Sequence, residues 1–164
     1  MFMMEVRKNY LKMNKEKSDT HLNYWLKTPP TEENKIYVGW KEIEELVDNL
    51  CYQIKTSHPN IKYVHGLKRG GLIPAVLVSH VLDLEYIDTP KHYEPMECLI
   101  IDDICDSGET LKKYGAEYPT AVLHYKPHTS CLEPTMYAFA HEGDEWIIYP
   151  WERDDSETIQ DYLK

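Results

Sequence analysis

The most regular pattern of apolar positions lies between Trp40 and His58. Apolar side chains recur there at the three- and four-residue spacing of a helix that buries one face. These positions are Ile43, Leu46, Val47, Leu50, Cys51 and Ile54. Because His58-Pro59 follows and proline does not continue a helix, we predict a helix that starts after Trp40 and packs this stripe in the core.

Short apolar runs predict the strands, at residues 36–38, 61–65, 85–87, 99–101, 120–125 and 147–149. The 99–101 run lacks polar alternation, which is typical of a buried parallel strand. One helix is expected from about residue 109 to residue 114. Another should follow Gly71 and direct four side chains inward, namely Leu72, Val76, Leu77 and Val81. This order of elements predicts an α/β fold, a mainly parallel sheet flanked by helices.

The chain has 164 residues, which suggests one domain with a core of its own. We expect residues 35–164 to form this domain, with a small C-terminal hood from about 127 to 153 and a short polar helix from 154 to 163. Residues 1–34 are expected to be an N-terminal extension or arm. This segment is either an exposed helix and tether, or an arm whose Trp25 cluster packs on a partner subunit or near the active site.

Composition narrows the possible partners. The net charge of −10 argues against nucleic acid, because phosphate backbones need Lys and Arg. No apolar run approaches the length of a membrane span, and the N-terminus lacks the apolar core of a signal peptide. The four cysteines have no CxxC spacing and are interpreted as reduced thiols, so we expect a cytoplasmic protein without a zinc site.

The chemistry concentrates directly after the 99–101 run. Asp102 and Asp103 place two carboxylates where that strand should end, and ligands of open α/β sheets bind beyond the carboxyl ends of strands. The turn at 106–110, Asp-Ser-Gly-Glu-Thr, offers backbone N–H groups and hydroxyls to a phosphate. The carboxylates would repel that phosphate, so we expect them to face sugar hydroxyls or Mg²⁺. The alternative is a plain turn at a strand end.

A second candidate anion site is Lys68-Arg69-Gly70-Gly71, between a predicted strand and a predicted helix. Two glycines let the backbone approach a ligand closely, and the two cations favour an anion. The loop is not a Walker A motif, because no Lys-Ser/Thr follows the glycines. On its own, it is equally a tight turn with two exposed cations.

Residues 98–110 resemble the phosphoribosyl-diphosphate (PRPP) motif of type I phosphoribosyltransferases, and every position of that motif matches. The resemblance implies that the ribose and the 5′-phosphate are held by Asp102, Asp103, Asp106, Ser107, Gly108, Glu109 and Thr110. It implies a Mg²⁺ ion, bound with PRPP at the acidic pair, and a pyrophosphate site at Lys68, Arg69 and Gly70. A cis peptide bond between Lys68 and Arg69 is also implied.

The segment from Trp146 to Glu152 resembles the hood of purine members, closest to the bacterial xanthine–guanine and hypoxanthine phosphoribosyltransferases. The resemblance implies that Trp146 stacks on the base, that the backbone at Ile147 reads the base edge, and that Lys126 donates to the oxygen at purine C6. A flat apolar face with a cation at a carbonyl suits an oxopurine.

The resemblance as a whole implies transfer of phosphoribose from PRPP to N9 of hypoxanthine, guanine or xanthine, with Asp106 assisting proton transfer as the catalytic residue. It also implies a homodimer or homotetramer. Two alternatives stay open, a PRPP-binding regulator without turnover and a phosphoribosyltransferase for another base. The connection at 88–97 is short for the family's closing loop, so it forms either a reduced lid or a simple connection. The sequence does not show which residue reads purine C2.

Overall fold

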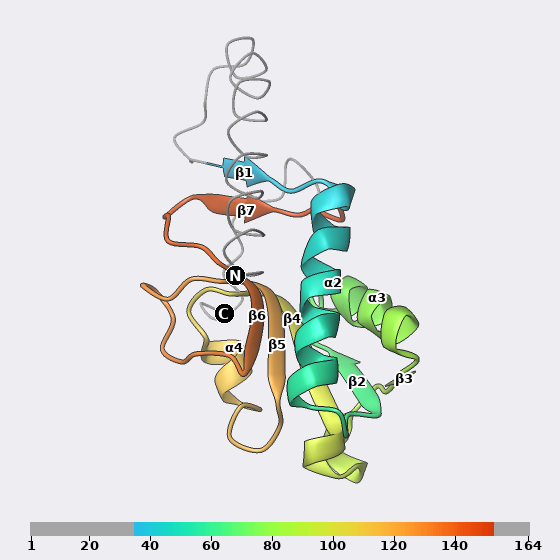
Figure 1. Cartoon of the computed structure of the whole chain (residues 1–164). Coiled ribbons are helices and arrows are strands. Elements are labelled where there is room, and N and C mark those ends of the chain that lie inside the picture. Colours follow the sequence, from blue (N-terminus) through green and yellow to red (C-terminus); the bar gives the residue numbers. More distant parts are fainter. Residues whose placement is uncertain (1–34, 153–164) are drawn as a thin grey trace. The chain divides into compact units, whose positions relative to one another are not determined.

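The computed structural model describes residues 35–152 (Figure 1). The predicted arm, 1–34, and the predicted closing helix, 154–163, lie outside the described residues. The described residues divide into a larger unit, residues 37–143 and 147–152, and a smaller unit, residues 35–36 and 144–146. Among the described residues, no helix combines the length and the apolar character that a membrane span requires.

A parallel five-stranded sheet forms the centre of the larger unit (Figure 1). Its spatial order is β3-β2-β4-β5-β6, and every neighbouring pair is parallel. The bounds are β2 Tyr63–Gly66, β3 Glu85–Tyr86, β4 Cys98–Cys105, β5 Thr120–Tyr125 and β6 Met136–Ala140. This sheet confirms the predicted fold class. The sequence analysis did not expect β6.

Two further strands, β1 (Lys35–Tyr37) and β7 (Trp146–Ile148), form a separate two-stranded sheet. Next to it, the backbone N–H of Val38 donates to the carbonyl oxygen of Ile148 at 2.9 Å. The predicted hood range, 127–153, contains both β7 and the main-sheet strand β6. The hood therefore stays a prediction.

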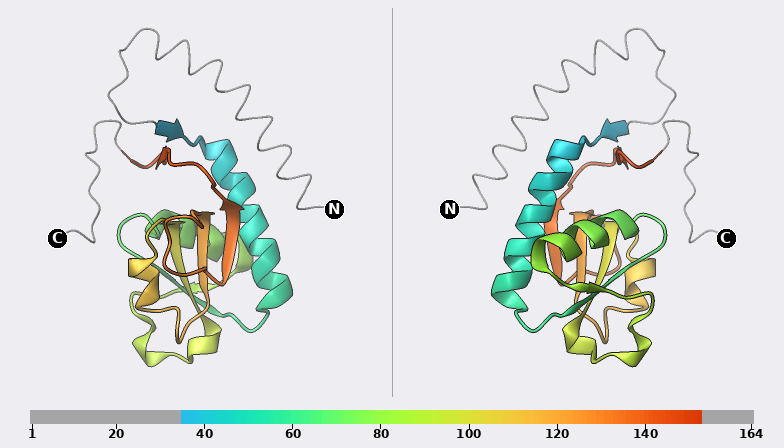
Figure 2. Two further views of the ribbon diagram at one scale, coloured as in Figure 1. Left: turned by 90° about the vertical axis from the view of Figure 1, so that its left-hand side faces the viewer. Right: turned by 90° about the vertical axis from the view of Figure 1, so that its right-hand side faces the viewer.

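Helices cover the two faces of the main sheet unequally. The helices α2 (Trp40–Ser57) and α3 (Leu72–Leu82) pack on one face, as the right-hand view of Figure 2 shows, and the short α4 (Glu109–Lys112) lies on the other. Alternate residues of β4 serve the two faces, because successive strand side chains point in opposite directions. Leu99 and Ile101 join the core under α2 and α3, and Ile100 joins the core with Leu111 of α4.

The helix α2 matches its prediction, because its whole apolar stripe is buried. The helix α3 does not. Val76 and Val81 point outward, with 43% and 51% of their surface exposed, while Ala75 and Val78 are fully buried. The sequence of α3 is apolar at nearly every position, so its periodicity does not identify the buried side.

The connection from Tyr86 to β4 runs from the end of β3 back to the amino end of the sheet. Cys98 pairs with Tyr63 at the first residue of both strands, so the chain must reach that end before β4 begins. The connection contains two short 3₁₀ helices, η1 (Pro90–His92) and η2 (Pro95–Glu97). The ring of Tyr93 packs on Tyr63 with centroids 4.4 Å apart. This geometry favours a simple connection over a reduced lid, since the predicted site lies at the carboxyl end.

The opposite exposure of two valines on α3 can be tested by truncating each one. Val78→Ala should lower the free energy of unfolding by about 2 kcal/mol, because it removes two fully buried methyl groups. Val76→Ala is the matched control and should change it by less than about 0.5 kcal/mol, since Val76 is exposed. Urea denaturation measures both. Equal losses would contradict the orientation of α3.

Candidate functional site

Three loops meet where β2, β4 and β5 end. Along β4, pairing with β2 stops at Ile101, whereas pairing with β5 continues to Cys105. Asp102 and Asp103 therefore lie within β4, and the strand is paired on one side only at these residues. The sequence analysis placed them just after the strand. Loops 67–71, 106–108 and 126–132 follow the three strands at this edge.

The 67–71 loop lies directly against the acidic pair. The N–H of Leu67 donates to the carbonyl oxygen of Ile101 at 2.8 Å, which extends the sheet by one bond. A Cβ on Gly70 would overlap the carboxylate of Asp103, and one on Gly71 would overlap the carbonyl oxygen of Ile101. Close approach of the loop to β4 therefore requires both glycines. The peptide bond between Lys68 and Arg69 is cis, as the resemblance implied.

The acidic pair carries charge into a buried environment. One oxygen of Asp102 accepts from the N–H of Asp103 at 3.0 Å, and one oxygen of Asp103 accepts from the N–H of Ile104 at 2.8 Å. Burial, and then the charge of Glu152, raise the pKa of Asp103 to about 6. Burial, and then the charge of Asp103, raise the pKa of Asp102 well above its usual range. Such a pair favours a neighbouring cation.

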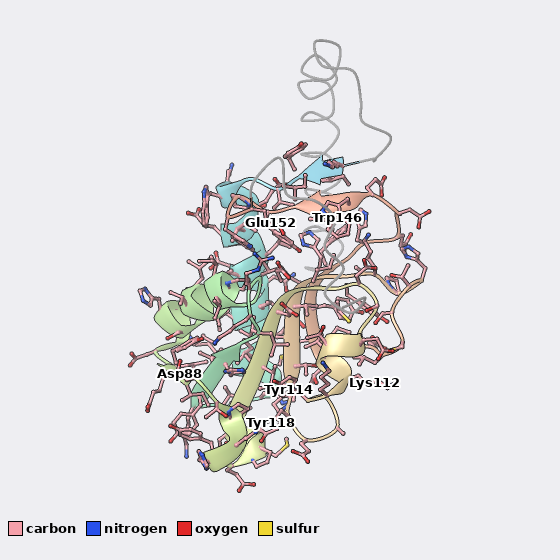
Figure 3. The ribbon with its side chains drawn as sticks, turned by 180° about the vertical axis from the view of Figure 1, so that it is seen from behind. Asp88, Lys112, Tyr114, Tyr118, Trp146 and Glu152 are labelled. Atoms are coloured by element: carbon pink, nitrogen blue, oxygen red, sulfur yellow. The ribbon has the colours of Figure 1, made fainter. Side chains whose placement is uncertain are left out.

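Glu152 is a third carboxylate of this region, and the sequence analysis assigned it no role. Its oxygen Oε2 accepts from the N–H of Tyr149 at 3.0 Å. Burial raises the pKa of Glu152, and the charge of Arg69 acts in the opposite direction. Glu152 therefore lies within electrostatic reach of both Asp103 and Arg69. Figure 3 shows Glu152 toward the carboxyl end of the sheet, with Asp88 and Tyr118 toward the other end.

The predicted phosphate turn, 106–110, has the expected glycine conformation. Gly108 has a φ of 78°, a left-handed value that favours glycine, and an added Cβ would lie 2.6 Å from Oγ of Ser130. The side chain of Ser107 turns back onto its own loop and accepts from the N–H of Glu109 at 3.4 Å. The helix α4 ends at Lys112 instead of the predicted residue 114, and a run of turns follows.

Hydrogen bonds from the 126–132 loop support the predicted phosphate turn and the end of β4. The hydroxyl of Thr129 donates to the carboxylate of Asp106 at 2.6 Å, and the N–H of Cys131 donates to the carbonyl oxygen of Ser107 at 2.9 Å. The N–H of Lys126 donates to the carbonyl oxygen of Cys105 at 2.9 Å. These bonds bring Lys126, which is buried, to the same edge as the acidic pair. No sequence pattern indicated a role for Thr129, because its partner Asp106 is distant in the chain.

The two other predicted base residues belong to different units. Trp146 lies in the smaller unit, and Ile147 lies in the larger one, where its buried side chain joins the main core. The role of the backbone at Ile147 in reading the base edge stays a prediction. The stacking role of Trp146 stays a prediction.

The raised pKa of Asp103 has a consequence for stability. An acid with a higher pKa in the folded protein favours folding below its unfolded pKa of about 4. That contribution is lost as pH rises through about 6. Asp103→Asn keeps an oxygen for the N–H of Ile104 and removes the charge. It should raise the free energy of unfolding at pH 7 by about 1–3 kcal/mol, with a gain that grows between about pH 4 and pH 6.

Urea denaturation of the full chain at pH 4, 5, 6 and 7 measures this effect. Asp88→Asn, at an exposed position away from the acidic pair, is the matched control. A variant that is less stable than the wild type at pH 7, or a gain that does not depend on pH, would contradict the account of the acidic pair.

Comparison with known proteins supports the same kind of site. No family model matches the chain. It is 30% identical over 148 residues to the xanthine-guanine phosphoribosyltransferase of Cereibacter sphaeroides, covering 73% of this chain and 88% of that protein. The xanthine-guanine phosphoribosyltransferase of Roseobacter denitrificans is 26% identical over 155 residues, covering 73% and 86%.

A solved structure agrees in fold. The purine phosphoribosyltransferase of Pyrococcus horikoshii aligns with a TM-score of 0.60 and 26% identity, over 73% of this chain and 95% of that one. The sequence likeness spans most of this chain and most of each relative. The chain therefore belongs to the xanthine-guanine phosphoribosyltransferases, a family of purine phosphoribosyltransferase enzymes.

Proposed function

We propose that this enzyme transfers phosphoribose from PRPP to N9 of an oxopurine in purine salvage. The products are a nucleoside monophosphate and pyrophosphate. The observation that carries the proposal is the close packing of the 67–71 loop on the acidic pair, where Gly70 lies against the carboxylate of Asp103. An anion loop and a sugar-binding carboxylate in direct contact fit a ligand that joins a ribose to a pyrophosphate.

Each part of PRPP has a suitable partner at this edge. The 5′-phosphate would accept from Ser107, Thr110 and the N–H groups of the turn around Gly108 and Glu109. The ribose hydroxyls would donate to Asp102 and Asp103. The backbone at Lys68 and Gly70 would hold the pyrophosphate, and Arg69 would bind it in a bidentate manner. The charge of Arg69 acts on Glu152, and the charge of Glu152 acts on Asp103. Arg69 therefore lies near the acidic pair, which supports its placement beside the same PRPP molecule.

The acidic pair fits a Mg²⁺ ion held jointly with PRPP. Asp103 is buried and Asp102 is half-buried, and their raised pKa values reflect negative charge without full compensation. Among residues 35–152, no cluster of three or more potential ligands forms a cage for a metal ion. Mg²⁺ usually binds one or two carboxylates together with substrate phosphates. When bound, this ion would neutralise charge on the departing pyrophosphate.

The base would enter from the side of Lys126 and Ile147. Lys126 would donate to the oxygen at purine C6, the backbone at Ile147 would read the base edge, and Trp146 would stack on the ring. The short hydrogen bond from Lys126 to Cys105 supports this role, because it fixes the residue next to the end of β4. The proposal also includes assembly of the chain into a homodimer or homotetramer. It further includes a cytoplasmic location.

In the reaction, the bond between ribose C1 and the pyrophosphate oxygen breaks, and a bond between C1 and N9 forms. Positive charge develops at C1, and the negative groups of Asp102 and Asp103 lie on the ribose side to stabilise it. The base loses one proton as N9 attacks. Asp106 would assist this transfer near N7, with its carboxylate held by Thr129 at 2.6 Å.

The experiment that tests the function measures pyrophosphate release by the full chain with PRPP and Mg²⁺. The bases are hypoxanthine, guanine, xanthine, adenine, orotate and uracil. We expect turnover with at least one of the first three. Turnover with orotate or uracil alone would overturn the assignment of the base site. PRPP binding without turnover on any base would favour the regulator.

Asp106→Asn tests the proton-transfer role. The substitution keeps an oxygen for the hydroxyl of Thr129 but removes the base, so kcat should fall by about 100-fold or more. The dissociation constant of PRPP should change by less than about threefold. Steady-state kinetics and calorimetry measure the two quantities.

Thr129→Val is the matched control, because it removes the hydroxyl that donates to Asp106 and keeps the carboxylate. Its kcat should fall by about tenfold at most, the effect of one lost hydrogen bond. Parallel losses in kcat and PRPP affinity for Asp106→Asn would place this residue in binding instead of proton transfer.

A further inference from the structure

A histidine lies in the middle of the most deeply buried strand. All six residues of β5 are buried, and His124 is fully so. A polar ring in such a place needs a hydrogen-bond partner, since a buried group without one destabilises the fold. The ring atom Nδ1 of His124 lies 2.8 Å from the hydroxyl oxygen of Tyr149, which is also buried.

The direction of this hydrogen bond follows from the next one. The hydroxyl of Tyr149 donates to the backbone carbonyl oxygen of Asp103 at 3.0 Å. A carbonyl oxygen only accepts, and a tyrosine hydroxyl has one proton to give. Nδ1 of His124 must therefore carry a proton and donate to the hydroxyl oxygen. Burial lowers the pKa of His124 to about 3, so the ring is neutral at pH 7.

The carbonyl of Asp103 needs this donor because the strand beside it has ended. Along β4, the carbonyl of Ile101 points to the β2 side and accepts from Leu67. Asp103, two residues further, points to the same side by the alternation of the strand. The last pair of β2 with β4 is Gly66 with Ile101, so no strand partner reaches Asp103 there. The hydroxyl of Tyr149 occupies the place of the missing strand.

Tyr149 also belongs to the segment that would read the base. It follows Ile147 and Ile148 of β7 directly, and its N–H donates to Glu152. Its ring stacks on Trp151, with centroids 4.9 Å apart and planes 4° apart. One residue thus contacts the acidic strand through its side chain and Glu152 through its backbone.

We propose that Tyr149, held by His124, is a positioning residue that fixes the backbone at Asp103 and thereby the direction of the acidic pair. The pair would then meet the ribose and its metal ion without rearrangement. The kinetic consequence rests on the proposed function, whereas the hydrogen-bonded chain from His124 to Asp103 does not.

Tyr149→Phe removes the hydroxyl and keeps the ring that stacks on Trp151. We expect the dissociation constant and the KM of PRPP to rise about five- to tenfold, the effect of one buried hydrogen bond. The KM of the base should change by less than about twofold. Tyr93→Phe, at the amino end of the sheet, is the matched control and should leave all three constants unchanged. An unchanged PRPP affinity in Tyr149→Phe would overturn the proposal, because a merely structural role predicts less active enzyme with normal affinity.

Substitutions at His124 test whether it acts through Tyr149. His124→Asn can place an amide donor near the position of Nδ1 and should keep most of the PRPP affinity, whereas His124→Leu should lose about as much as Tyr149→Phe. In the Tyr149→Phe background, His124→Leu should have no further effect on PRPP affinity. Additive losses would overturn the coupling between the two residues.

Nitrogen NMR of the full-length wild-type protein tests the hydrogen bonds from His124 to Tyr149 and Asp103. The measurement needs neither turnover nor a substitution in the measured sample. The signals of His124 are identified by their absence in His124→Asn. A neutral ring with its proton on Nδ1 is expected at pH 7. A proton on Nε2 would overturn the hydrogen-bond direction even in an active enzyme. If the protein has the expected tautomer but no turnover, the hydrogen bonds from His124 to Asp103 are supported. That result would count against the proposed function instead.

Discussion

The burial of two adjacent carboxylates in one strand is the constraint on which this site depends. Asp103 is buried and Asp102 is half-buried, and loss of solvent raises the pKa of each. Two N–H groups of the strand itself compensate part of the charge. Glu152 adds to the negative potential instead of relieving it. The protein alone therefore leaves this charge partly uncompensated, and a ligand with hydroxyl donors or a cation relieves it.

The same constraint explains the composition of the neighbouring loops. A loop can approach the carboxylate of Asp103 only where it has no side chain, and Gly70 and Gly71 meet that condition. On the other side of β4, the turn at Gly108 lies against Ser130 with equally little room. Both loops present backbone N–H groups, which suit phosphate, while the carboxylates between them suit hydroxyls. In the proposed complex with PRPP, the opposite preferences would keep the two parts of the phosphorylated sugar in a fixed order.

Sequence reasoning was most successful where the signal is local. The stripe of α2 and the run of β5 follow from adjacent residues, and the structure confirms them. The prediction for α3 was wrong at Val76 and Val81, because a helix that is apolar all round has no single face to identify. The strand β6 was missed although Met136–Ala140 is itself a short apolar run, and its pairing with β5 identifies it.

The site shows the same division between local and distant information. The acidic pair and the phosphate turn form one continuous motif, so the sequence was sufficient to find them. Thr129 lies 23 residues from its partner Asp106, Tyr149 lies 46 residues from Asp103, and Glu152 is still further along the chain from Asp103. Their side chains are common types in unremarkable surroundings, and only the fold gives them partners. His124 also lies in an apolar run, and the sequence analysis assigned it no role.

The unequal pairing of β4 connects these observations. If β2 continued beside Asp103, its backbone would satisfy the carbonyl there, but it would also occupy the space on that side of the acidic pair. Because β2 stops at Gly66, the 67–71 loop can turn in front of the carboxylates, and the carbonyl of Asp103 loses its strand partner. A single hydroxyl, from Tyr149, replaces that partner with far less volume than a strand. The edge thus stays open for a ligand while its backbone remains fully hydrogen-bonded at this carbonyl.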